Sequence, residues 1–132
     1  MVRLLIIILL AVSLVGLASF EQLWVRHVYR NLETDLAILR YNFSLVDEEG
    51  DVDTEENKEL SLAMFHYWVR QERRLAMIAR HSDLSQVSDS LIYIVNFVHF
   101  NNKEEASVGM KKLQYLIDTH QFNIATSVRN VI

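Results

Sequence analysis

The chain contains no cysteine and no proline, and it has only three glycines in 132 residues. Without cysteine it has no disulfide, no thiolate ligand for a metal, no cysteine nucleophile and no lipid-modified N-terminal cysteine. With so few turn-forming and helix-breaking residues, it is poorly suited to a sandwich or barrel of many short strands. The composition therefore predicts an all-α protein whose stability comes from side-chain packing.

The longest apolar segment runs from residue 4 to residue 20 without a charge, between Arg3 and Glu21. As a helix it is about 25 Å long, and one further turn that includes Trp24 completes the roughly 30 Å of a bilayer core. Its many Leu, Ile and Val residues make insertion favourable. We therefore predict a transmembrane anchor. Its lipid-facing residues are expected to be Leu4, Ile8, Val12, Leu17, Phe20 and Trp24.

Two other interpretations of this segment remain. Gly16, Leu17 and Ala18 have the small-residue pattern of a signal-peptidase site, so that cleavage would release a secreted domain beginning at Ser19. A buried core helix would need a polar face, which this segment lacks. Because the helical pattern continues past Ala18 without a turn, we favour an uncleaved anchor at residues 1–22.

The charges around the anchor do not favour one orientation. Arg3 precedes it and favours a cytoplasmic N-terminus, whereas Arg26, Arg30 and Arg40 lie after it. A very short N-terminal segment is typical of a signal anchor that exports the domain on its C-terminal side. We therefore expect a single-pass protein of the cell membrane with an extracytoplasmic C-terminal domain.

Residues 23–132 form the expected helical domain. Apolar residues recur every three or four positions, which indicates amphipathic helices. The segments end near residues 45, 80, 100 and 120, and the tail 121–132 is a candidate fifth helix. Asp53, Ser82 and Asn102 are the expected N-caps. Because each apolar stripe must be covered, we predict an antiparallel bundle of about four helices, continuous with the anchor, or two stacked hairpins.

The sequence has no clear pattern of a metal site or a catalytic motif. The acidic run from Asp47 to Glu56 has Gly50 in the wrong place for an EF-hand, so we interpret it as a solvated loop. The five histidines never recur at i, i+3 or i+4, which leaves no helix with two imidazoles for one metal. No phosphate-binding loop or serine elbow is present. We expect neither a cofactor nor an enzyme.

The charge balance argues against nucleic-acid binding. Only Arg3 of the 13 Lys and Arg residues precedes the anchor, and the rest face 17 Asp and Glu. A local basic group consists of Arg70, Arg73, Arg74 and Arg80. We interpret it as a solvated face, with contact to anionic lipid headgroups as the alternative.

Several features resemble the bacterial membrane family catalogued as domain of unknown function 4363. They are the N-terminal anchor, Trp68, the segment HSDLSQVSDSLIYIVNFVHFNNKEEASVGMKKLQYLIDTH and the ending VRNVI. The resemblance covers most of the chain but rests on a diffuse pattern, and the acidic loop departs from it. It implies a single-pass anchor with a helical domain. The family has no established activity, so the resemblance carries over no catalytic residues.

Two functions remain. The first is a non-catalytic interaction or accessory module that binds another membrane or envelope protein through surfaces at Trp24, Tyr29 and Tyr41. The second is a ligand-binding or sensing module with an apolar cleft between helices. The cleft would be lined by Phe65, Trp68, Tyr93 and Phe97, which could equally be ordinary core residues. The sequence leaves the oligomeric state open.

Overall fold

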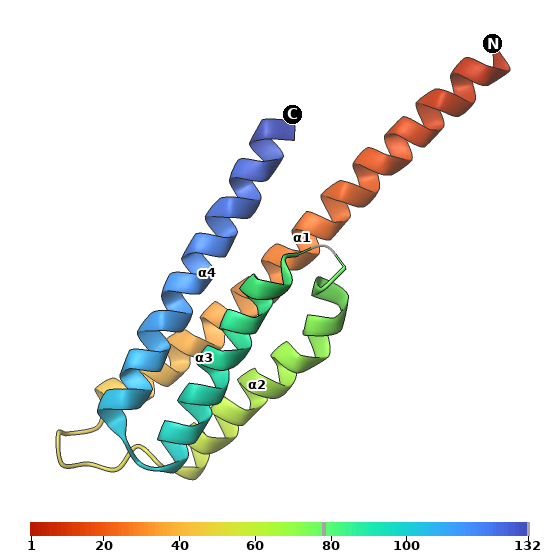
Figure 1. The fold of residues 1–132 in the computed structure, drawn as a ribbon. Helices are drawn as coiled ribbons and strands as arrows, with labels where there is room; N and C mark the ends of the chain where they lie inside the picture. The colour runs from red at the N-terminus through yellow and green to blue at the C-terminus, as the bar shows by residue number, and fades with distance from the viewer. Residues whose placement is uncertain (78, 132) are drawn as a thin grey trace.

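The computed structural model describes residues 1–77 and 79–131, with side chains described as far as Gln121. The helices are α1 (Val2–Ser44), α2 (Glu55–Leu75), α3 (His81–His99) and α4 (Lys103–Val131) (Figure 1). Within the described ranges there is no strand, which confirms the all-α prediction.

The predicted anchor segment and the first helix of the domain form one continuous helix of 43 residues, α1. It is long and apolar enough to cross a membrane, and its residues up to Phe20 are exposed along their whole length. Burial begins at Val25, close to the predicted domain boundary, and continues at Leu32, Leu36 and Leu39. The N-terminal half of α1 projects beyond the other helices (Figure 1).

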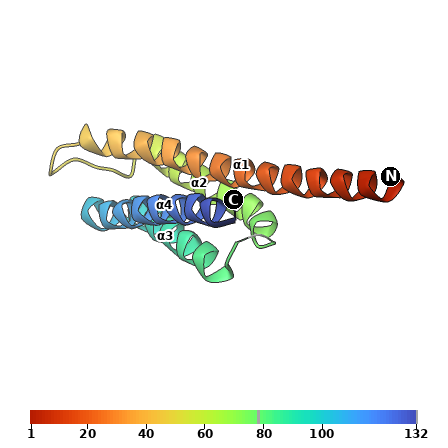
Figure 2. The ribbon, with the colours of Figure 1, turned by 90° about the horizontal axis from the view of Figure 1, so that it is seen from above.

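The remaining helices cover the buried stripe of α1. Successive helices run in opposite directions in both views (Figures 1 and 2). α1 packs against α2 and α4, and α3 packs against the same two helices. The core takes apolar side chains from all four helices. Among those less than 2% exposed are Leu36, Trp68, Leu91 and Leu113.

The N-caps of α4 and α3 agree only in part with the sequence prediction. Asn102 caps α4 as predicted, because its Oδ1 accepts the backbone N–H of Glu105 at 3.2 Å. α3 begins at His81, so Ser82 lies inside it and does not cap it.

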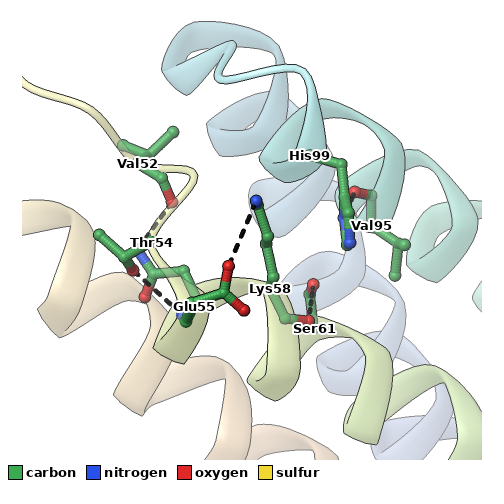
Figure 3. A network of polar contacts seen from close by, with 8 residues as sticks. Val52, Thr54, Glu55, Lys58, Ser61, Val95 and His99 are labelled. Atoms are coloured by element: carbon green, nitrogen blue, oxygen red, sulfur yellow. Dashed lines mark hydrogen bonds and ion pairs between the residues drawn. The ribbon is translucent and has the colours of Figure 1, made fainter.

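The cap of α2 differs from the prediction by one residue. α2 is capped by Thr54 and not by Asp53, since the Thr54 hydroxyl accepts the N–H of Asn57 at 3.2 Å. Figure 3 shows this start of α2, where Lys58 Nζ also lies 3.7 Å from Glu55 Oε1. The acidic loop therefore passes directly into a capped helix.

Two helix ends also differ from the prediction. α2 ends at Leu75, five residues before Arg80, and it passes into a turn in which the Met77 N–H donates to the Arg74 carbonyl at 3.2 Å. The tail 121–132 does not begin a separate helix: α4 continues through it to Val131, and Ile132 lies outside the described residues.

The end of the domain away from the anchor is held together by Asn101. This residue has a positive φ of 54° in the turn between α3 and α4. Its Oδ1 accepts the N–H of Val52 at 2.7 Å, and its Nδ2 donates to Asp51 Oδ1 at 2.8 Å. Lys103 Nζ donates to the Val46 carbonyl at 2.9 Å. The acidic loop is therefore fastened to the α3–α4 turn.

Candidate functional site

A buried polar contact joins α1 to α4 near the anchor. The Tyr29 hydroxyl lies 2.8 Å from His120 Nδ1, and the two residues are 2% and 6% exposed. The rings meet edge to face with centroids 5.6 Å apart. Tyr29 lies on the same stripe as Val25 and Leu32, so periodicity indicates that it faces inward. Nothing in the sequence pairs it with a histidine 91 positions later.

Asp83 at the start of α3 is the third member of this group. Its Oδ1 lies 3.9 Å from His120 Nε2. Burial lowers the pKa of His120, and the negative charge of Asp83 partly opposes that shift. Burial, and next Asp83, raise the pKa of Tyr29, so its hydroxyl keeps its proton and can donate to Nδ1. The neutral imidazole then carries its proton on Nε2, on the side of Asp83.

A second polar chain passes through Trp68. The indole Nε1–H donates to Ser88 Oγ at 2.8 Å, and the Ser88 hydroxyl lies 3.2 Å from Glu72 Oε1. The Trp68 ring contacts Tyr29, with centroids 5.8 Å apart. Together the two chains connect all four helices in the half of the domain nearest the anchor.

The order Tyr29, His120, Asp83 has the connectivity of a nucleophile, a base and an orienting acid. However, Tyr29 is almost completely buried, and the raised pKa makes its hydroxyl a weak nucleophile. At 2% exposure, the Tyr29 side chain presents almost no surface to solvent. The arrangement therefore serves to hold helices together.

The four aromatic residues of the predicted cleft are placed as follows. Trp68 is completely buried in the core, and Phe65 and Phe97 are partly buried against it. Tyr93 stacks on Phe97 with centroids 4.6 Å apart, and its hydroxyl donates to Glu105. Trp68 thus fills the space between helices, as the core interpretation requires.

A shallow groove lies elsewhere, on the outer face of α1. It is lined by Arg30, Glu33, Thr34, Ala37, Ile38 and Tyr41. Ile38 and Tyr41 are 45% and 63% exposed, which is a high exposure for apolar side chains on a packed helix. Tyr41 thus lies on a surface, as predicted. Trp24 is partly buried. The prediction that Tyr29 lies on an interaction surface is wrong, because Tyr29 belongs to the buried stripe of α1 and faces the core.

The described side chains place no three His, Cys, Asp or Glu residues together as a metal site. Comparison with models of protein families finds no match, and comparisons with curated proteins and with solved structures find none either.

Proposed function

We propose that this protein is a membrane-anchored, non-catalytic interaction module of the cell envelope, in which α1 holds an antiparallel four-helix bundle at the extracytoplasmic surface. The observation that carries the proposal is the continuity of α1. One unbroken helix contains both the exposed apolar segment and the stripe that packs into the core.

This continuity has a mechanical consequence. A flexible linker would let the domain move freely above the bilayer, whereas a helix sets both its height and its rotation. With about 1.5 Å per residue, Tyr41 stands about 30 Å beyond Phe20 along the axis. The groove on α1 is therefore held at a defined height above the bilayer, which favours a partner that is anchored in the same membrane.

The groove has the chemistry of a helix-docking surface. Ala37 provides close approach, Ile38 and Tyr41 provide exposed apolar area, and Arg30 and Glu33 lie at the end nearer the anchor. A partner helix with one apolar stripe and complementary charges fits this pattern. Anchoring both proteins in one membrane raises their effective concentration. A bound partner of this kind needs no cofactor.

Membership of the family catalogued as domain of unknown function 4363 is part of this proposal, as is a bacterial source. The anchor and helical domain agree with the features that the resemblance implies. The buried and weakly nucleophilic Tyr29 supports a role without catalysis.

The first experiment tests anchoring and sidedness. Full-length protein with a C-terminal tag is fractionated, treated with protease from outside, and weighed by intact-mass spectrometry. The proposal requires the uncleaved mass in the membrane and a tag that external protease removes. A soluble product beginning at Ser19 would make it a secreted domain, and a tag accessible only from the cytoplasm would reverse the orientation.

The second experiment tests the groove. A photo-crosslinking phenylalanine analogue replaces Tyr41, and the control carries it at Tyr115, which is similarly exposed at 68% but lies on α4. We expect one membrane-protein adduct at position 41 that Ala37→Glu removes. Equal adducts at both positions would contradict a specific partner site.

A further inference from the structure

The turn between α2 and α3 carries a concentrated positive charge. Three exposed arginines lie in the last turns of α2 and a fourth comes directly before α3, and between them lies Met77, which is 87% exposed. We call this group the arginine turn; it consists of Arg70, Arg73, Arg74, Met77 and Arg80. From the sequence alone, these arginines are interpreted as the solvated face of a helix. Their position relative to the predicted anchor suggests a contact with the membrane surface.

The register of α2 against α1 is defined by three contacts. Asn42 Nδ2 donates to Asn57 Oδ1 at 3.1 Å, and Asn31 Nδ2 donates to the Tyr67 hydroxyl at 2.9 Å. The Tyr29 and Trp68 rings meet next along the helices. The two helices are therefore antiparallel, so each residue further along α2 lies level with a residue one position earlier in α1.

This register brings the arginine turn to the level of the expected bilayer surface. About six or seven residues beyond these contacts, Arg74 lies level with Leu23 or Trp24 of α1. Met77 follows the end of α2 by two residues, so it comes about one turn closer to Phe20, where the apolar segment ends. In Figures 1 and 2 the end of α2 lies beside α1, near the place where α1 begins to project beyond α2 and α3.

The charges of the arginine turn are available to a ligand. Among the described residues the ion pairs are Lys58–Glu55 and His120–Asp83, and neither involves an arginine. Two carboxylates close to these arginines in the sequence are engaged inside the domain, because Glu72 accepts from Ser88 and Asp83 lies 3.9 Å from His120.

The acidic residues gather at the opposite end of the domain. The loop before α2 and its first turn contain Asp47, Glu48, Glu49, Asp51, Asp53, Glu55 and Glu56. The domain is therefore polarised, with positive charge toward the anchor and negative charge away from it. An anionic surface attracts the first end and repels the second.

We propose that the arginine turn binds the anionic phospholipid headgroups of the bilayer that α1 spans, with Met77 inserted between them. The arginines contact lipid phosphates, and the unbranched Met77 side chain reaches the apolar boundary. This second attachment rests on the proposed anchor and fixes the tilt of the bundle, so that the groove on α1 faces along the membrane.

The absence of cysteine makes a single-site probe practical. Met77→Cys is labelled with an environment-sensitive fluorophore in the full chain, reconstituted into nanodiscs with or without phosphatidylglycerol. Lipids carrying a doxyl quencher then report proximity to the bilayer. The control is Phe100→Cys, which is also strongly exposed, at 77%, but lies in the α3–α4 turn at the acidic end.

A pair of charge variants tests the arginines themselves. Arg73→Gln with Arg74→Gln removes two adjacent charges at the bilayer level. Lys111→Gln with Lys112→Gln removes two adjacent exposed charges from the middle of α4 and is the matched control. The arginine double variant should lower the ratio of docked to undocked protein by roughly 10- to 30-fold, because it removes the attraction of two basic residues to the anionic surface.

The expected result is quenching of the label at position 77 that requires phosphatidylglycerol. It should be absent for the label at position 100, lost in the arginine variant and kept in the lysine variant. A chain that stays in the nanodisc without such quenching at position 77 overturns lipid docking while the anchor stands. A chain that does not enter nanodiscs overturns the anchor and the docking together. Equal loss in both charge variants would indicate a non-specific effect of net charge and would also overturn the proposal.

Discussion

Tyr29 on α1 and His120 on α4 lie 2.8 Å apart, hydroxyl oxygen to Nδ1, and both are almost completely buried. This contact ties α1 to α4. Because a buried histidine is harder to protonate than a solvated one, the contact also couples the stability of the domain to pH.

The first prediction concerns acid. Burial lowers the pKa of His120 in the folded protein below that of the unfolded chain, which is near 6.5. As the pH falls below that value, the unfolded chain takes up a proton that the folded state binds less well, so stability decreases. Thermal unfolding of the full chain in detergent should show a lower Tm at about pH 5 than at about pH 8. His120→Gln should reduce this difference, and an unchanged pH dependence would contradict the role of His120.

The second prediction concerns Trp68, which is completely buried and donates to Ser88. Trp68→Ala should lower the free energy of unfolding by about 3–5 kcal/mol, because it leaves a large cavity. Trp68→Phe keeps most of the volume and should cost about 1–3 kcal/mol, largely because Ser88 Oγ loses the indole N–H that it accepts. The neighbouring Val69→Ala, at a site 43% exposed, is the control. A folded Trp68→Ala variant of normal stability would instead favour the cleft interpretation.

The third prediction separates the two roles of Asn101. Asn101→Gly keeps the positive φ but loses the bonds to Val52 and Asp51, whereas Asn101→Ala loses the bonds and adds backbone strain. We expect a loss of about 1–2 kcal/mol for Gly and a larger loss for Ala. Denaturant unfolding measures both. If the Ala and Gly variants lose the same free energy of unfolding, the backbone conformation carries no strain at this position.

The fourth prediction concerns the close approach of α3 and α4 at Gly109. A Cβ there would lie 2.8 Å from Tyr93 Cδ1 and 2.9 Å from Ile94 Cγ1. Gly109→Ala should therefore destabilise the domain by about 1–3 kcal/mol, although alanine is the better helix former. The control is Gly16→Ala, where no atom lies within 4 Å and stability should not fall. A more stable Gly109→Ala variant would mean that the two helices move apart easily.

Local patterns in the sequence account for most of the helical structure. Leu32, Leu36 and Leu39 recur at helical spacing, and that spacing alone indicates the buried face of α1. The Asn102 cap is also predictable, because a cap depends on residues three positions apart. The cap of α2 differs from the prediction by one residue, since Asp53 and Thr54 are both good caps and only the path of the loop selects Thr54.

The tertiary structure decided which distant side chains meet. The bond between Tyr29 and His120 joins residues 91 positions apart, and no periodicity along one helix contains that information. The register of α2 against α1, which pairs Asn57 with Asn42 and Tyr67 with Asn31, likewise depends on how the two helices pack. Composition and spacing determined that this chain forms amphipathic helices with one apolar end, because those properties are local. Packing determined which polar groups are buried together and which charges lie toward the anchor, because those properties depend on the whole core.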